Sequence, residues 1–384
     1  MNQPTPAAAP AGAPQYPLAG ITVLDLGQIY QGPYCGFLLA TAGARVIKIE
    51  SPQGDPVRSA GGDAVPFAML NGNKESVCID LKTPQGKAEF LKLVDQADVL
   101  IENFVPGVMA RLGLAPEDLL ARNPRLVYGS ASGYGSTGPY RDMMAMDFTI
   151  QAMSGMLNAT GEPDGPPVKT GPATIDFLGG SHLYGAVMTA LFERERTGKG
   201  RICEVAMLDV AYFTLTSYIG AYLGNPDFVP RTGNHHAGLS LAPYNLYAAK
   251  DGYFAVLCIK DVHWQGVARA MGRDDLAQDA RLATHAQRSQ DMSFIDDLVQ
   301  SWTLTQTRAE LAEAAKVHGF PGSPVRHVGE VMADAHMLAR GSLTEVDHPT
   351  LGRITLPTNP MRFAGLPPMP LRPSPALGQH GEGS

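Results

Sequence analysis

The sequence predicts an α/β protein with a mainly parallel sheet that is covered by helices on both faces. Short apolar segments alternate along the chain with segments whose apolar residues recur at helical spacing. The short segments are apolar nearly throughout, which is typical of strands buried on both faces. A helix between two strands also favours a parallel pair, because parallel strands need a long connection. The 384 residues, 44% of them hydrophobic, allow a substantial core and more than one domain.

Strands and helices alternate through the first part of the chain. Residues 83–97 place Phe90, Val94 and Ala97 on one helical face, and Pro84 suits the first turn of that helix. The other elements predicted here are strands at 21–27, 44–50, 98–104 and 125–135, and helices within 32–44 and at 116–122.

The rest of the chain is predicted to add one long helix, one strand and a smaller unit at about 224–320. Helical spacing runs from 180 to 196, and the glycines of TGKG end this helix before a strand at 201–208. The segment LAPYNLYAAKDGYFAVLCI predicts a hairpin that turns at 250–252, and a mostly helical stretch follows at 292–317. The polar, proline-rich C-terminal segment is expected to trail over the surface.

Composition excludes several classes of function. The formal net charge is −7 and no stretch is rich in Lys or Arg, which argues against a nucleic-acid partner. No apolar run approaches the roughly 18–20 residues that span a bilayer. Residues 1–17 lack the charged and apolar regions of a signal peptide and are expected to form a flexible tail. The four scattered cysteines suit reduced thiols, so the predicted location is the cytoplasm.

Common catalytic motifs are absent from the sequence. It contains neither a proper GxGxxG after the first strand, nor a phosphate loop, HExxH, or GxSxG at a strand-to-helix turn. His235 and His236 lie together without further ligands at metal-binding spacing, so no metal site is predicted. Arg58, Arg111 and Lys74 can each meet a phosphate or be a solvated surface charge. Asp176 lies just before the long helix, where residue type alone favours a capping role over a catalytic one.

Several separate blocks of the sequence together resemble the class III CoA-transferases, the family that includes formyl-CoA transferase, carnitine CoA-transferase and α-methylacyl-CoA racemase. The blocks occur in family order between about residues 18 and 210. They read LAGITVLDLGQIYQGPYCGFLLATAGARVIKIESPQGDPVR, NGNKESVCIDLKTPQGK, DVLIENFVPGVMARLGL, NPRLVYGSASGYGSTGPY, DFTIQAMSGMLNATGEPDGPPVKTG, DFLGG and ALFERERTGKGRICEVAMLD.

The resemblance implies that Asp176 is the catalytic nucleophile. An aspartate with its reference pKa of about 3.9 is anionic at neutral pH and needs no general base. Its attack on an acyl-CoA thioester gives a mixed anhydride and CoA thiolate, and an aspartyl-CoA thioester follows. Both intermediates react with water, so the site is expected to exclude it.

The resemblance also implies a set of contacts to coenzyme A, the predicted co-substrate. Tyr30 and Gln31 match the loop near the pantetheine and thioester. Asn103 and Phe104 match a segment that flanks the nucleotide. Two further matches are Arg111, placed for a phosphate, and Ile79, placed near the adenine. Ordinary core packing remains an alternative for Phe104 and Ile79.

Three positions bear on the second substrate. Asp147 matches an acidic residue of the acyl pocket, and Met146 replaces the histidine that racemase relatives carry immediately before it. Methionine cannot carry the proton that a two-base racemisation needs. A racemase or epimerase is therefore the second hypothesis, behind CoA transfer. The loop GNHHAGLSLAPY replaces a run of four glycines in formyl-CoA transferase, which disfavours formate and oxalate. A dicarboxylic acid with succinyl-CoA as donor is favoured, with His235, His236 or a nearby arginine receiving the distal carboxylate.

The architecture implied by the resemblance is an interlocked homodimer of two ring-like subunits. Each subunit has a large Rossmann-like domain built from both chain ends and a smaller α+β middle domain. The expected bounds are 18–200 with about 335–384 for the large domain, 225–320 for the small domain, and linkers at 201–224 and 321–334. A third hypothesis is a non-catalytic protein that binds acyl-CoA and keeps this fold.

Overall fold

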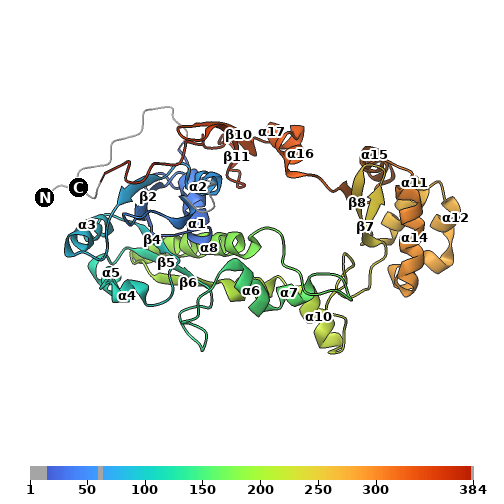
Figure 1. The fold of residues 1–384 in the computed structure, drawn as a ribbon, viewed down its shortest axis with the longest axis horizontal. Helices are drawn as coiled ribbons and strands as arrows, with labels where there is room; N and C mark the ends of the chain where they lie inside the picture. The colour runs from blue at the N-terminus through green and yellow to red at the C-terminus, as the bar shows by residue number, and fades with distance from the viewer. Residues whose placement is uncertain (1–14, 59–63, 382–384) are drawn as a thin grey trace. The chain divides into compact units, whose positions relative to one another are not determined.

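The chain divides into two compact units. This is a computed structural model, which describes residues 15–58 and 64–381. The first unit comprises Met1–Met153, Gly171–Ala211 and Met332–Ser384, and the second comprises Ser154–Thr170 and Tyr212–Val331 (Figure 1). The first unit thus contains residues from both ends of the chain, while the predicted middle domain, 225–320, falls inside the second unit.

A six-stranded parallel sheet forms the first unit, in the order β3-β2-β1-β4-β5-β6. This is the doubly wound order of the Rossmann fold. Its strands are β1 (Thr22–Asp25), β2 (Arg45–Glu50), β3 (Glu75–Cys78), β4 (Val99–Glu102), β5 (Val127–Ser132) and β6 (Ile202–Ala206). The predicted α/β class is confirmed. Only β3 was missed, because this short edge strand reads ESVC and carries two polar residues.

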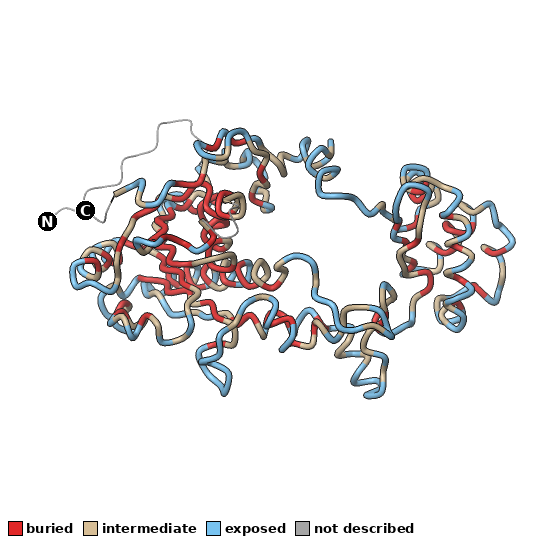
Figure 2. The backbone as a smooth tube through the Cα atoms, viewed as in Figure 1, coloured by how far each residue is buried: buried red, intermediate tan, exposed pale blue. Residues whose placement is uncertain are grey.

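Helices cover both faces of the sheet, as the continuous apolar strands predicted. Val23 packs in one core cluster with residues of helices α1 and α8, while its neighbour Leu24 packs in a second cluster with Phe90 of α3. Successive strand residues therefore pack on opposite faces, and the central strands of the sheet are buried (Figure 2). The principal helices of this unit are α1 (Gln31–Thr41), α3 (Pro84–Val94), α5 (Pro116–Arg122) and α8 (Thr174–Thr197).

Helix α8 begins at Thr174, six residues before the expected start. Gly179 and Gly180 weaken the apolar periodicity in that first part of the helix. Both are required by a close approach of α1, because a Cβ on Gly180 would lie 2.6 Å from the backbone oxygen of Gln31. Asp176 is therefore inside the first turn of α8, not in front of the helix.

The remaining elements of the first unit connect these layers. They are η1 (Pro56–Arg58), α2 (Val65–Asn71), α4 (Val108–Arg111), α6 (Asp147–Ser154), α9 (Met207–Phe213), α17 (Ala335–Ala339), β10 (Leu343–His348) and β11 (Gly352–Pro357); α6 and α9 each continue into the second unit.

The C-terminal segment runs over the surface without helix or strand at its described residues 358–381, as expected, but it also forms a hairpin before that point and hydrogen bonds to the rest of the unit. Strands β10 and β11 form an antiparallel hairpin. Farther on, the backbone N–H of Arg372 donates to Asn73 Oδ1 at 2.6 Å, and that of His380 donates to the carbonyl of Ser76 in β3 at 2.9 Å. These long-range hydrogen bonds satisfy an edge strand and were invisible to local periodicity.

The second unit has its own core. The predicted hairpin is confirmed as β7 (Tyr244–Ala249) and β8 (Gly252–Leu257), which β9 (Gly322–Pro324) extends. The predicted helical stretch is two helices, α14 and α15, because Thr307 caps the second with its side chain. The helices are α7 (Met156–Ala159), α10 (Thr216–Gly224), α11 (Asp261–Ala270), α12 (Asp274–Gln278), α13 (His285–Arg288), α14 (Met292–Thr303), α15 (Arg308–His318) and α16 (Val328–Met332).

Within the described part of the chain, no helix combines the length and the apolar character needed to cross a bilayer.

Candidate active site

The strand order places a ligand site at the carboxyl ends of β1 and β4. The order 3-2-1-4-5-6 reverses direction between these two strands, so their following loops diverge and leave a crevice. The loop after β1 leads into α1 and carries Gln28, Ile29 and Tyr30. The loop after β4 begins with Asn103 and Phe104.

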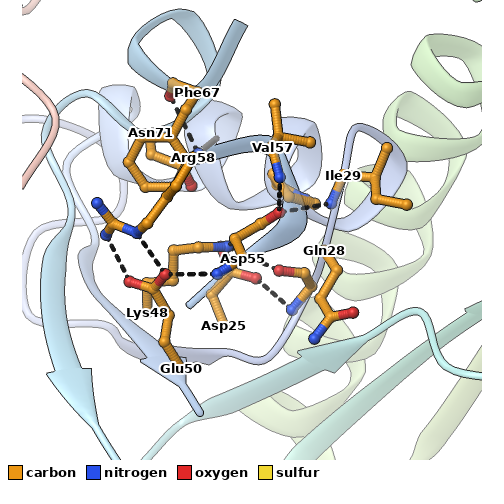
Figure 3. Close-up of polar contacts among 12 residues, drawn as sticks. Asp25, Gln28, Ile29, Lys48, Glu50, Asp55, Val57, Arg58, Phe67 and Asn71 are labelled. Carbon is orange, nitrogen blue, oxygen red and sulfur yellow. Dashed lines mark hydrogen bonds and ion pairs between the residues drawn. The ribbon is translucent and has the colours of Figure 1, made fainter. Parts of the chain in front are cut away.

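Buried charges hold the loop after β1 from beneath (Figure 3). Lys48 Nζ donates to the carbonyl of Gly27 at 2.7 Å and lies 2.9 Å from Asp55 Oδ2, with both side chains 1% exposed. Asp55 Oδ1 in turn accepts the backbone N–H of Ile29 at 3.2 Å. Ile29 has φ = 65°, a conformation that a β-branched residue rarely adopts. The surrounding charges therefore maintain a strained backbone at the site.

A second buried pair lies beside the first. Lys74 Nζ is 2.7 Å from Asp25 Oδ2, and both side chains are fully buried. Burial lowers the pKa of Lys74 to about 8, although the Asp25 carboxylate acts in the opposite direction. Arg58 pairs with Glu50 at 2.6 Å and stacks on Phe67. The suggestion that Lys74 and Arg58 are solvated surface charges is therefore wrong, because each pairs with a buried carboxylate.

Asn103 joins the two loops. Its Nδ2 donates to the carbonyl of Gln28 at 2.9 Å, and its Oδ1 accepts the backbone N–H of Gln28 at 2.7 Å. The predicted ligand-flanking residue thus uses its whole amide to position the neighbouring loop.

Two carboxylates meet at the start of α8. Asp147, the first residue of α6, accepts the backbone N–H groups of Ile175 at 2.7 Å and Asp176 at 3.2 Å through Oδ2. Gln151 Nε2 donates to Asp147 Oδ1 at 2.6 Å. Asp147 therefore does the capping that Ala173, at the N-cap position, cannot do.

The Asp176 carboxylate itself takes no part in capping the helix. Among residues 15–58 and 64–381, no side chain or backbone group forms a hydrogen bond or ion pair with it. Burial, followed by the nearby charge of Asp147, raises its pKa to about 7. The expectation of an ordinary aspartate pKa is therefore wrong, because the sequence does not show this environment.

Asp176 opens into a cavity of about 110 Å³ at the diverging loops. The described residues that line it come from six segments, and among them Asp176 is the only anion and Arg141 the only cation. They are Gln28, Ile29, Gln31, Asn103, Phe104, Val105, Pro106, Ser132, Gly133, Arg141, Met143, Ala145, Met146, Asp176 and Met207.

Gln31 brings an unpartnered amide to this cavity. Its side chain is 2% exposed, and its Nε2 has no hydrogen-bond partner in the described structure. A Cβ on Gly179 would lie 2.5 Å from this nitrogen, so the glycine makes room for the amide. Its neighbour Tyr30 is outside the cavity lining and stacks on Phe177 with ring centroids 6.1 Å apart.

The other predicted ligand contacts separate into two kinds. Ile79 is 2% exposed in the core, which fits the packing alternative. Phe104 packs against that core and also lines the cavity. Arg111 ends α4 on the surface, where its Nη1 would lie 3.2 Å from a Cβ on Gly107. No ion pair or side-chain hydrogen bond of Arg111 occurs among the described residues, so its charge is available.

His235 and His236 belong to the second unit. His235 Nε2 is 2.7 Å from Asp296 Oδ2, and its Nδ1 is 3.2 Å from the carbonyl of Thr232. Tyr247 donates to the other oxygen of Asp296 at 2.5 Å. His235 is therefore committed to holding its own loop, whereas His236 lies against Tyr244.

Sequence reasoning missed Arg141 and Gly179. Neither carries a local signal: Arg141 sits in a loop between β5 and α6, and Gly179 lies within a helix.

Across the described ranges, no group of three or more His, Cys, Asp or Glu residues is arranged to hold a metal ion.

Comparison with known proteins identifies relatives along almost the whole chain. The family model described as CoA-transferase family III matches residues 18–381. Succinyl-CoA–D-citramalate CoA-transferase of Chloroflexus aurantiacus is 37% identical, with 96% of this chain and 92% of the relative covered. Acetyl-CoA:oxalate CoA-transferase of Acetobacter aceti is 35% identical, with 99% and 97% covered. The crystal structure of a CAIB/BAIF family protein from Brucella suis matches with a TM-score of 0.82 and 36% identity, covering 96% and 98%.

Proposed function

The chain belongs to CoA-transferase family III and transfers CoA between an acyl-CoA and a carboxylic acid, and we propose that Asp176 performs this transfer as a covalent nucleophile. One observation carries the proposal. The half-buried Asp176 carboxylate has no partner among the described residues, yet it faces a cavity at the switch point of the sheet.

The first half of the reaction loads CoA onto the enzyme. An Asp176 oxygen attacks the thioester carbonyl of the acyl-CoA, the carbon–sulfur bond breaks, and CoA leaves as its thiolate. The product is a mixed anhydride between the acyl group and Asp176. The thiolate then attacks the aspartyl carbonyl, which releases the donor acid as a carboxylate and leaves an aspartyl-CoA thioester.

The second half runs the same steps toward the acceptor. The acceptor carboxylate attacks the aspartyl thioester and expels CoA thiolate, giving a new anhydride. The thiolate attacks the acceptor's acyl carbon, so acceptor acyl-CoA leaves and the Asp176 carboxylate is restored. No proton is gained or lost overall, so the cycle requires no general base.

Gln31 is suited to stabilise the negative charge that develops in these steps. Each attack converts a carbonyl oxygen into an oxyanion, and a preorganised N–H donor stabilises that charge most where water is excluded. The Gln31 Nε2 group lines the same cavity as Asp176 and has no other partner in the described structure. It therefore gains a hydrogen bond when substrate arrives.

The acids exchanged are proposed to be small dicarboxylates, with succinyl-CoA as a donor. D-citramalate, which the name of the Chloroflexus aurantiacus relative pairs with succinyl-CoA, carries two carboxylates. CoA itself is proposed to lie along the diverging loops, near Tyr30, Asn103 and Phe104, with the free Arg111 toward a phosphate. Ile79 is then proposed to pack in the core beneath the adenine site.

We also propose the interlocked homodimer, with a large domain at 18–200 and 335–384, a small domain at 225–320 and linkers at 201–224 and 321–334, in the cytoplasm. Large apolar side chains that a partner subunit would cover support it. Phe213 is 81% exposed, Leu223 77% and Phe192 67%. His235 and His236 then serve the acyl pocket through their loop.

Trapping the intermediate tests the covalent role. We expect hydroxylamine or borohydride, added with an acyl-CoA, to modify Asp176, and peptide mass spectrometry to find the label in the peptide that contains it. The control is the enzyme without acyl-CoA, which should stay unlabelled. A label on another residue, or none with any acyl-CoA tested, contradicts the proposal.

The acid limb of the pH profile tests the coupling of the two carboxylates. Because the pKa of Asp176 is about 7, kcat/KM should fall about tenfold per pH unit below that value. In the Asp147→Asn variant, the amide oxygen still accepts the two helix N–H groups, but the charge is gone. We expect the acid limb to move about 0.5–1 unit toward lower pH. An unmoved limb, with Asp164→Asn as the exposed control, would show that Asp147 does not influence the nucleophile.

A further inference from the structure

The cavity beside Asp176 is electrically asymmetric. Asp176 is an anion at the reacting end, and the acids exchanged are anions too, so the reacting groups repel one another. Arg141 is the only cation that the described residues contribute to the lining. An anionic substrate in this cavity is therefore attracted toward one side chain.

The Arg141 guanidinium is free to bind a ligand. Its one ionic contact in the described structure is with the adjacent Asp142, at 3.4 Å, where the two side chains are 48% and 80% exposed. Such an exposed pair contributes little and exchanges readily with solvent or ligand. Other arginines of the first unit are held more tightly: Arg45, Arg58, Arg122, Arg194 and Arg201 have carboxylate contacts of 2.6–3.0 Å.

The apolar part of the cavity lining suits a hydrocarbon spacer. Met143, Ala145, Met146 and Met207 belong to it, and methionine side chains adapt to ligands of varied shape. A substrate with one carboxylate at each end thus finds a nucleophile, an apolar wall and a cation in one cavity.

A second cavity continues past Arg141. Its volume is about 370 Å³, and it shares Val105, Pro106, Ser132 and Arg141 with the first. Beyond that border its charged groups are carboxylates, contributed by Glu102, Glu117 and Glu204. A ligand carboxylate that passed Arg141 would meet acidic side chains and no further cation among the described lining residues, so Arg141 is also the favoured end point for a short diacid.

We propose that Arg141 binds the distal carboxylate of the transferred acid through its guanidinium, and so selects short dicarboxylates over monocarboxylates. This inference rests on the proposed function, because it takes Asp176 as the reacting end. It assigns to Arg141 the role that the sequence analysis gave to His235, His236 or a nearby arginine. A planar guanidinium binds a carboxylate with two parallel hydrogen bonds, which gives direction as well as attraction.

A competition experiment tests the proposal. Succinate and butyrate are offered together at equal concentration with one CoA donor, and the two acyl-CoA products are quantified by mass spectrometry. We expect the wild-type enzyme to favour succinyl-CoA, and Arg141→Met to lower the product ratio about 10–100-fold. Arg141→Lys, which keeps the charge but loses the paired geometry, should give an intermediate ratio.

The ratio is insensitive to other causes of low activity. Both acceptors compete for the same enzyme molecules, so a loss of folded protein or of CoA affinity cancels. Arg122→Met, which removes an exposed arginine that pairs with Asp95, is the matched control and should keep the wild-type ratio. An Arg141→Met ratio equal to that of wild type overturns the inference, whatever happens to the rate.

The trapping experiment and the competition experiment together separate this inference from the proposed function. If the trapped wild-type enzyme carries no label at Asp176, the covalent mechanism fails. If Asp176 is labelled but the product ratio does not respond to Arg141→Met, only the assignment of Arg141 fails.

Discussion

Replacing Asp176 with asparagine should abolish CoA transfer and, above neutral pH, make the protein more stable. An amide is a poor nucleophile and cannot form the anhydride, so we expect kcat to fall by at least about 10³–10⁴-fold. The shape of the side chain is nearly unchanged, so substrate binding should survive. Steady-state turnover, with acyl-CoA binding measured by calorimetry, separates the two effects.

The stability effect follows from the pKa of Asp176. The value is about 7 in the folded protein against 3.8 for the ordinary side chain. Between these pH values the folded state holds a proton that the unfolded chain has released, so stability falls as pH rises through this window. Asparagine has no such proton to lose. We expect the variant to be more stable than the wild type by about 1–3 kcal/mol at pH 8, and the difference to vanish near pH 4.

Denaturant unfolding at pH 4, 6 and 8 measures this difference. Asp164→Asn changes an exposed carboxylate and should alter neither activity nor stability. Equal stabilities of wild type and Asp176→Asn at pH 8 would mean that the Asp176 carboxylate is not held in an unfavourable environment.

Replacing Gly179 with alanine should damage catalysis without weakening the fold. The new Cβ would lie 2.5 Å from Gln31 Nε2, which is closer than atoms of this kind pack, so the amide must move. If that amide stabilises the oxyanion, kcat/KM should fall about 10²–10³-fold. Alanine is also favoured over glycine inside a helix by about 1 kcal/mol, so stability should hold or rise.

The same helix provides a matched control. Gly185 is also in α8, and a Cβ there would meet nothing within 4 Å. Gly185→Ala should gain the same helical preference and keep full activity. A double-mutant cycle then tests the cause: in a Gln31→Ala background, Gly179→Ala should cost little more. Similar activity for Gly179→Ala and Gly185→Ala would remove Gln31 from the proposed mechanism.

The sequence predicted the central strands of the sheet better than the edge strand, the C-terminal segment and the start of α8. Strands such as β1 and β4 were recognisable because burial on both faces leaves them almost purely apolar. The sequence did not predict edge strand β3 or the contacts of the C-terminal segment, because hydrogen bonds to partners hundreds of residues away satisfy their polar groups. The early start of α8 was hidden by Gly179 and Gly180, which serve packing against α1 rather than helix propensity.

Within the site, the sequence identified important residues but did not predict their protonation or their contacts. The sequence blocks identified Asp176 and Asp147, but Asp176 was expected to keep the ordinary pKa of an aspartate. Asp147 proved to be the acceptor for the first turn of α8, a position from which its charge raises the pKa of Asp176. Lys74 and Arg58 looked like surface cations and proved to be partners of Asp25 and Glu50.

The sequence by itself determined the fold class and the family and pointed to Asp176 as the nucleophile that we propose, because apolar periodicity and ordered blocks of residues are properties of the chain read in one dimension. Only the tertiary structure decided which groups share a cavity: Arg141 on one loop, Gln31 beneath Gly179, and Asp176 beside Asp147. The physical reason is that charge, desolvation and steric fit depend on distance through space, and residues far apart in sequence acquire that distance only on folding.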